Sequence, residues 1–188
     1  MIRKTTLQNG VSVLTETMPG CASASVGLTL GIGSREETER NNGVAHLFEH
    51  AVFKGTAKRS PLEIAQAVEL RGGILNAYTT REQTCFYART AAADVLGALD
   101  VICEMVREPA LDPDAVALEK SVVVEEIRSC LDDPEDLAGD LFCEALWGKA
   151  GPGLPITGTV SSVRGLGVGD LRAHRRTALE RRPVVVAA

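Results

Sequence analysis

The stretch His46-Leu47-Phe48-Glu49-His50 contains two of the chain's three histidines, with a glutamate next to the second. On an α-helix, residues four apart lie one above the other on the same face, with Cβ atoms about 5–6 Å apart. Two imidazoles placed in this way can bind one metal ion, and the carboxylate of Glu49 reaches the same side. Residues 43–45 and 51–53 are mostly apolar, which indicates a buried helix whose polar groups need a partner.

The order His-x-x-Glu-His is a known pattern of zinc hydrolases. Two imidazoles bind zinc, and a neighbouring carboxylate can act as general base for the water that the metal activates. A solvated helix face with the same residues is the alternative, because such short motifs carry a false-positive risk. The apolar flanks favour a metal site, and we therefore expect Zn²⁺ as the cofactor.

A catalytic zinc site needs a third protein ligand and an open position. We expect His174 at the surface, because it lies in the basic run 172–176, which repels cations. The segment from Asp114 to Asp132 is predicted to form one long helix, since apolar residues recur there at roughly helical spacing. Glu119 and Glu126 share a face of this helix. Spacing alone favours Glu126 as the third ligand only slightly over a pairing of these glutamates with surface charges.

Short motifs occur along nearly the whole chain, in addition to the histidine-containing stretch. They lie at residues 7–13, 33–37, 43–50, 53–56, 72–73, 76–79, 82–84, 122–127, 132–136 and 155–159. In this order they resemble the inverzincin peptidases (pitrilysin-like, M16), specifically the bacterial branch similar to mitochondrial processing peptidase. Any one of these motifs is weak by itself, and the resemblance rests on their order.

The resemblance implies a role for each residue of the predicted metal site. His46, His50 and Glu126 match the zinc ligands of that family, and Glu49 matches its general base. Glu119 matches an accessory glutamate, which is expected to support the catalytic site without binding zinc directly.

Asn76 and Ala77 match the strand whose edge binds the backbone of the substrate in that family. The resemblance therefore implies a zinc-dependent endopeptidase, or the catalytic subunit of one, that cleaves extended peptides with metal-activated water. The peptide substrate would add to residues 76–79 through backbone hydrogen bonds. Two alternatives stay open. One is a non-catalytic zinc-binding or scaffold subunit of a peptidase-like assembly. The other, less favoured, resembles the S-ribosylhomocysteine lyases, with Cys130 as third ligand.

The chain departs from the family in its domain organisation. Members of this branch usually carry two such domains, whereas we expect residues 1–188 to form a single M16-type peptidase domain, equivalent to the N-terminal half of a usual member. The Arg/Tyr pair that the family's second domain supplies has no match in this sequence. We therefore expect a homodimer, or a heteromeric partner that supplies a second domain.

Composition limits the remaining classes of function. A length of 188 residues with 45% hydrophobic content is typical of one globular domain. The formal charge of −5 gives no sign of a nucleic-acid partner. Five cysteines without Cys-x-x-Cys spacing indicate reduced thiols. We find neither an apolar signal core nor a membrane span, and we expect a cytoplasmic protein without a membrane partner.

The pattern of expected elements indicates the fold class. Strands are predicted at residues 7–15, 24–30, 74–79, 84–90 and 184–187. Helices are predicted from residue 43 to about 55, at 60–71, 92–107, 134–146 and 167–180, and along the long segment described above. This order indicates an α+β fold with a largely antiparallel sheet covered by helices. It is the metallohydrolase type that the resemblance implies, similar to mitochondrial processing peptidase and the S-ribosylhomocysteine lyases.

Overall fold

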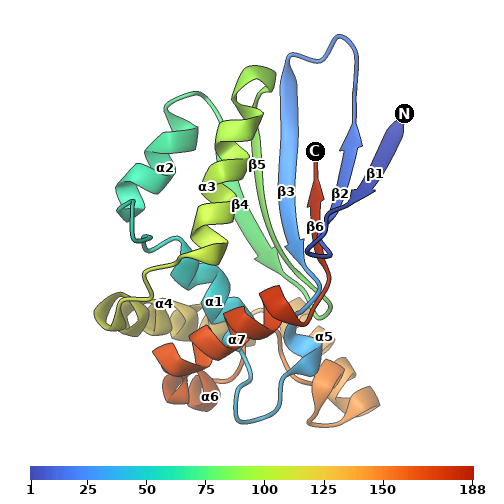
Figure 1. Cartoon of the computed structure of the whole chain (residues 1–188). Coiled ribbons are helices and arrows are strands. Elements are labelled where there is room, and N and C mark those ends of the chain that lie inside the picture. The colour runs from blue at the N-terminus through green and yellow to red at the C-terminus, as the bar shows by residue number, and fades with distance from the viewer.

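A six-stranded sheet forms the centre of the computed structural model, which describes residues 1–188 (Figure 1). In spatial order, the strands are β1 (Ile2–Thr6), β2 (Ser12–Glu16), β6 (Val184–Ala187), β3 (Ser23–Leu30), β5 (Thr84–Ala91) and β4 (Ile74–Thr79). Only β2 and β6 pair in parallel, and all other neighbours are antiparallel. The predicted α+β class with a largely antiparallel sheet is confirmed.

The helices lie against one face of the sheet and around one end of it (Figure 1). They are α1 (Val44–Val52), α2 (Pro61–Glu69), α3 (Val95–Arg107), α4 (Pro113–Asp132), α5 (Pro134–Trp147), α6 (Val160–Gly165) and α7 (Val168–Glu180). Helix α3 packs on β3 and β5, whereas α1 contacts α4, α7 and β4. None of the helices combines the length and the apolar character that crossing a membrane requires.

Alternate residues of the central strands build the core on the side of the sheet that faces the helices. Leu28 of β3 and Phe86 of β5 are cross-strand partners, and both are buried. Leu47 and Phe48 of α1 are fully buried in the same core cluster. Because successive helix residues point in different directions, this packing fixes which side of α1 carries His46.

Helix α4 begins at Pro113, one residue before the predicted start. Oδ1 of Asp112 accepts hydrogen bonds from the backbone N–H groups of Asp114 (3.1 Å) and Ala115 (3.0 Å). Pro113 occupies the first helical position, where its missing N–H costs no hydrogen bond. The position of Glu119 and Glu126 along the helix axis is set from this cap.

Three elements differ from the prediction. The strand predicted at residues 7–15 starts too early: residues 12–15 belong to β2, but residues 7–11 form the turn between β1 and β2, where the N–H of Leu7 donates to the carbonyl of Val11 (2.8 Å). Strand β1 has no predicted counterpart. Its sequence is polar apart from Ile2 and every residue in it is exposed, so it lacks the apolar alternation that marks a strand. Helix α6 was not predicted. It has six residues, held by reciprocal hydrogen bonds between Thr159 and Ser162, and is too short to show a helical period.

Candidate metal centre

Helix α1 is fixed at its N-terminus by a buried carboxylate. Oε2 of Glu37 accepts hydrogen bonds from the N–H of Gly43 (2.7 Å) and from Nδ2 of Asn42 (2.9 Å), and its Oε1 accepts from the N–H of Ala45 (2.9 Å). Burial raises the pKa of Glu37 to about 7, against the opposite effect of these three donors. Nδ2 of Asn42 also donates to the carbonyl of Pro155 (2.8 Å). The start of the helix is therefore tied to two separate loops.

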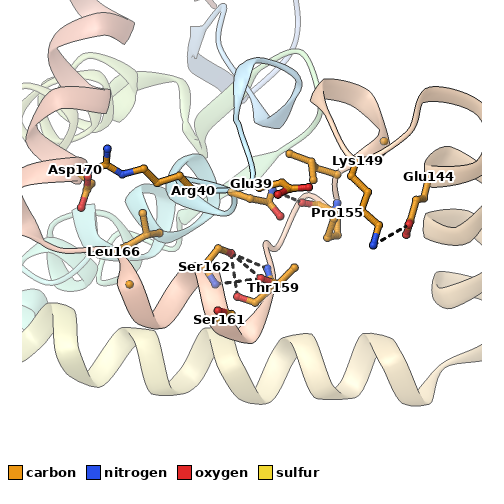
Figure 2. Close-up of a pocket in the computed structure, with 14 residues that line it drawn as sticks. Glu39, Arg40, Glu144, Lys149, Pro155, Thr159, Ser161, Ser162, Leu166 and Asp170 are labelled. Atoms are coloured by element: carbon orange, nitrogen blue, oxygen red, sulfur yellow. Dashed lines mark hydrogen bonds and ion pairs between the residues drawn. The ribbon is translucent and has the colours of Figure 1, made fainter.

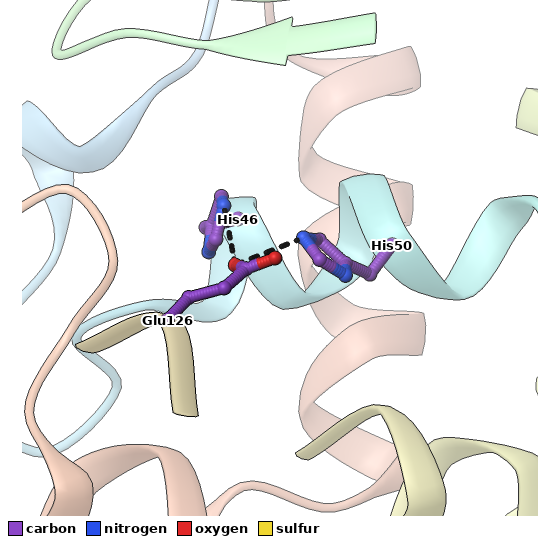
Figure 3. A group of neighbouring side chains, drawn as sticks. All are labelled: His46, His50 and Glu126. Carbon is purple, nitrogen blue, oxygen red and sulfur yellow. Dashed lines mark ion pairs between the residues drawn. The ribbon is translucent and has the colours of Figure 1, made fainter. Parts of the chain in front are cut away.

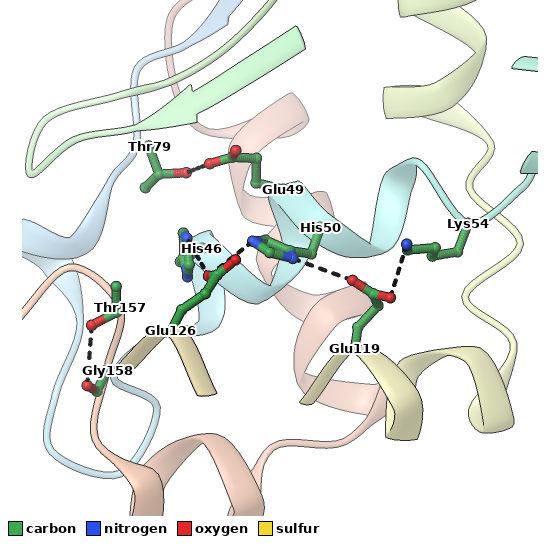
Figure 4. A network of polar contacts seen from close by, with 9 residues as sticks. All are labelled: His46, Glu49, His50, Lys54, Thr79, Glu119, Glu126, Thr157 and Gly158. Atoms are coloured by element: carbon green, nitrogen blue, oxygen red, sulfur yellow. Dashed lines mark hydrogen bonds and ion pairs between the residues drawn. The ribbon is translucent and has the colours of Figure 1, made fainter. Parts of the chain in front are cut away.

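A pair of glycines lets one of these loops approach the helix closely. Gly43 has a φ of 87°, and a Cβ there would lie 2.7 Å from the carbonyl oxygen of Thr157. Gly158 has a φ of 81°, and a Cβ there would lie 2.7 Å from the carbonyl oxygen of Asn42. Only glycine combines this backbone conformation with so little space. As a result, Thr157 and Gly158 lie beside the site (Figure 4).

His46, His50 and Glu126 form one cluster (Figure 3). Figure 3 shows the carboxylate of Glu126, which comes from α4, between the two imidazoles of α1. Oε2 of Glu126 lies 3.7 Å from Nε2 of His46 and 3.4 Å from Nε2 of His50. The structure thus brings together the three residues predicted as metal ligands.

This set of donors fits a zinc ion. Ligand atoms that bind zinc tetrahedrally at about 2.0–2.1 Å lie about 3.3 Å from one another, close to the two separations just given. Zinc requires neutral imidazoles, and burial, helped by the neighbouring His50, lowers the pKa of His46 to about 4. The side chain of Glu126 is 42% exposed, so the site is open to solvent on that side, as a catalytic zinc site needs to be.

Glu119 lies behind His50 and outside the cluster (Figure 4). Its Oε2 is 3.2 Å from Nδ1 of His50, and its Oε1 forms an ion pair with Nζ of Lys54 at 2.8 Å. With a metal bound at Nε2, the proton of the neutral His50 ring lies on Nδ1, which then donates to Glu119. Such a carboxylate fixes the tautomer and the orientation of a metal-binding imidazole. This position suits the accessory role expected for Glu119.

Replacing Glu119 with glutamine is expected to weaken zinc binding about 10- to 100-fold, the usual effect of losing such a supporting contact. Glutamine keeps the shape but loses the charge that pairs with Lys54 and strengthens the bond to His50. Competition with a chromophoric chelator measures the affinity. Glu125→Gln is the matched control, because Glu125 is exposed on the same helix and pairs only with Arg128. Equal zinc affinity in the two variants would refute the supporting role.

Glu49 lies on the same helix, but its carboxylate points toward β4 instead of toward Glu126 (Figure 4). Its Oε2 accepts a hydrogen bond from Oγ1 of Thr79 at 2.6 Å. Burial raises the pKa of Glu49; the Thr79 hydroxyl and His50 act against this effect, while Glu126 adds to it. A carboxyl group with a raised pKa is suited to accept and then release a proton near neutral pH.

Asn76 and Ala77 lie on β4, the edge strand of the sheet. This strand pairs only with β5, so its second edge has no partner strand. The N–H of Ala77 donates to Oδ1 of Asn76 at 2.8 Å, and it therefore faces that unpaired edge. The structure places both residues where an extended peptide could add as a further strand; that it does so remains a proposal.

His174 is buried, so its predicted surface position is wrong. It is 8% exposed, and its ring centroid lies 5.4 Å from that of Phe48. The basic run around it hides the helical period of α7, in which Leu171, His174 and Ala178 all face the core. Burial lowers the pKa of His174 to about 4. As expected, it takes no part in the metal cluster.

His174 is predicted to make the protein less stable in acid. The ordinary pKa of a histidine, which applies to the unfolded chain, is 6.5, whereas that of His174 in the folded protein is about 4. The unfolded protein therefore takes up this proton first, and stability that is present above pH 6.5 is lost as the pH falls toward 4. A shift of one pKa unit corresponds to about 1.36 kcal/mol. As the pH falls from about 7 to about 4.5, the natural protein should therefore lose about 2–3 kcal/mol more of its unfolding free energy than His174→Leu, which has no imidazole at this position. Urea unfolding of both proteins measures this. His46 titrates similarly but is present in both, so its effect cancels. A difference between the proteins that does not change with pH would contradict the prediction.

Three contacts of the site could not be found by spacing. Lys54 pairs with Glu119, which lies 65 positions further along the chain. Thr79 donates to Glu49 from another element, and Glu37 caps the helix from a preceding turn. All three lie in motifs that support the family resemblance, at residues 33–37, 53–56 and 76–79. The motifs therefore carried the signal, but not which side chains meet.

A polar cavity of about 690 Å³ lies elsewhere in the molecule (Figure 2). Its lining includes Arg40, Thr159, Ser162 and Lys149, and the last of these pairs with Glu144 at 3.6 Å. None of its lining residues belongs to the metal cluster. The cavity is therefore separate from the metal cluster.

Comparison with known proteins places this chain in a family. The model of the insulinase family, peptidase family M16, matches residues 12–160. The chain belongs to this family. An uncharacterized zinc protease of Streptomyces coelicolor is 40% identical over 187 residues, which cover 100% of this chain and 41% of that protein. The beta subunit of mitochondrial-processing peptidase from Blastocladiella emersonii is 37% identical over 185 residues, 98% of this chain and 40% of that protein. The M16 chain thus spans about two fifths of the length of these relatives.

Solved structures show the same fold. A protease from Helicobacter pylori matches with a TM-score of 0.93 and 23% identity, covering 100% of this chain and 45% of that one. A peptidase M16 inactive domain from Pseudomonas fluorescens matches with a TM-score of 0.88 and 20% identity, covering 100% and 46%. The resemblance found in the sequence motifs is confirmed at the level of family and fold. Because one of these neighbours is an inactive domain, the fold alone does not establish catalysis.

Proposed function

We propose that this M16 chain is a zinc-dependent endopeptidase, or the catalytic subunit of one, that cleaves extended peptides. The observation that carries the proposal is the convergence of His46, His50 and Glu126 from two helices. Glu49 lies on the same helix as the two histidines, with a raised pKa. The relatives called zinc proteases support both the metal and the chemistry.

Each residue has a distinct role in the proposed reaction. Zinc, when bound, would polarise the scissile carbonyl and lower the pKa of water toward about 7. Glu49 accepts a proton from the attacking water and later passes it to the leaving amine. Glu119 holds His50 in its binding orientation. Asn76 and Ala77 hold the peptide at the free edge of β4 through backbone contacts, so we expect loose sequence preference.

The test is metal-dependent cleavage. Purified protein should bind about one zinc ion per chain and hydrolyse a fluorogenic peptide. A chelator should abolish the hydrolysis, and added zinc should restore it. Protein that carries zinc but cleaves no peptide, either alone or together with a partner, would overturn the catalytic proposal and leave the scaffold alternative.

The scaffold alternative is supported by the likeness to an inactive M16 domain. Against it, His46, His50 and Glu126 converge in one cluster, and Glu49 lies on the same helix as the two histidines. The lyase alternative gains no support from the structure, because Cys130 lies outside the metal cluster. Burial and the carboxylates of Asp136 and Asp140 raise the pKa of its thiol, which disfavours the thiolate that binds zinc.

We also propose that the chain works with a partner, either a second copy or a separate chain that supplies a second domain. One relative is by its name a subunit. Helix α5 has no buried residue, and its side chains Leu141, Phe142, Leu146 and Trp147 are 50–64% exposed. Exposed apolar groups gathered in this way mark interaction sites. Size-exclusion chromatography with light scattering tests this, and a stable monomer that cleaves peptides would count against it.

A cytoplasmic location is proposed on the basis of the cysteines. All five are free thiols in the structure. Free thiols persist in compartments kept reducing by glutathione and thioredoxin. Fractionation of cells that express the natural protein would test the location.

A further inference from the structure

Glu49 is held by a single hydrogen bond. The hydroxyl of Thr79 donates to Oε2 of Glu49 at 2.6 Å, and no other side chain or backbone group of the protein bonds to this carboxylate (Figure 4). Oε1 of Glu49 therefore accepts no hydrogen bond from the protein. One oxygen is anchored and the other stays available to take a proton.

The donor comes from a rigid position. Thr79 is the last residue of β4, and its backbone pairs with Thr84 of β5. The turn that follows is closed by a hydrogen bond from the N–H of Thr80 to the carbonyl of Gln83 (2.8 Å). Threonine is also stiff about its first side-chain torsion, because it is branched at Cβ. A hydroxyl held in this way selects one orientation of the flexible glutamate opposite.

The same strand presents the edge proposed to bind substrate. Thr79 lies two residues from Ala77, whose N–H faces that edge. We infer that Thr79 is a positioning residue: its hydroxyl sets the general base Glu49 at a fixed place relative to the bound peptide. This inference rests on the proposed peptidase function. The strand that aligns the substrate then also aligns the base, without contacting the metal ligands.

Activity assays on the full chain, loaded with zinc, form the first test. Thr79→Val keeps the shape and removes the hydroxyl. It should lower kcat about 10- to 100-fold, the scale of a small misplacement of a reacting group, with KM and zinc content unchanged. Thr79→Ser keeps the hydroxyl and should restore most of the activity. The matched control is Thr29→Val on β3, where the hydroxyl bonds to Cys85 away from the site, and its kcat should equal that of the natural protein.

The second test does not depend on activity. The unfolding equilibria of Thr79→Val, Glu49→Ala and the double variant form a double-mutant cycle. A hydrogen bond to a charged group should make the two substitutions non-additive by about tenfold or more in the unfolding equilibrium constant. Additive substitutions would overturn the inference, as would a Thr79→Val protein with normal kcat. An inactive natural protein with a coupled pair would refute the peptidase function while leaving the contact between Thr79 and Glu49 established.

Discussion

Replacing Glu49 with glutamine is expected to lower peptide cleavage by about 10²- to 10⁴-fold, the range that general base catalysis contributes. Zinc binding should stay intact, because the Glu49 carboxylate points to Thr79 and lies outside the metal cluster. Glutamine has the same shape and can still accept a hydrogen bond from Thr79, but it cannot take a proton. Steady-state hydrolysis of a fluorogenic peptide, with metal analysis of the same samples, measures both effects.

Adding excess zinc distinguishes the loss of activity in Glu49→Gln from a loss caused by missing metal. A variant with weakened metal binding, such as Glu119→Gln, should regain activity when zinc is in excess. Glu49→Gln should not, because its defect lies in proton transfer. Equal rates for Glu49→Gln and the natural protein would show that the cleavage does not come from this site.

The elements that could be predicted are those with strong local signals. The capping box formed by Ser60 and Glu63 marks the start of α2, and Asp133 with Pro134 marks that of α5. Strands β4 and β6 lie within the predicted limits. Where the local signal is absent, the prediction fails. The polar strand β1 is stabilised only by pairing with β2, a tertiary effect that propensity does not reveal.

In the metal centre, too, one part follows from local structure and another part depends on tertiary packing. His46 and His50 share one helix, so their proximity follows from helical geometry alone. Glu126 lies on another helix, and spacing could only make it a candidate. Its place beside the histidines depends on the packing of α1 against α4. For His174, the predicted surface position is wrong because the charged residues on either side of it indicate an exposed helix. Its buried position follows from packing against Phe48, which is a tertiary contact.

Removing the carboxylate of Glu126 by alanine substitution is expected to lower zinc affinity about 10²- to 10³-fold. Binding of a structural zinc ion by four ligands contributes about 10–16 kcal/mol in total, so one ligand accounts for roughly 2.5–4 kcal/mol. At about 1.4 kcal/mol per factor of ten, this corresponds to two to three decades. Competition with chelators of graded affinity measures the change, and circular dichroism checks that the helices are retained. Retention is expected because the Glu126 side chain is 42% exposed and is not among the buried residues of the core.

Cys130→Ala is the matched substitution, because Cys130 lies one turn further along the same helix. A thiolate ligand would make this variant the one that loses zinc, as the lyase alternative requires. The structure leads to the reverse expectation, since the thiol of Cys130 is outside the cluster and its pKa is raised by burial. Zinc affinity should therefore fall in Glu126→Ala and stay unchanged in Cys130→Ala. If Glu126→Ala binds zinc as tightly as the natural protein, His46 and His50 have another third ligand and the proposed active site is wrong.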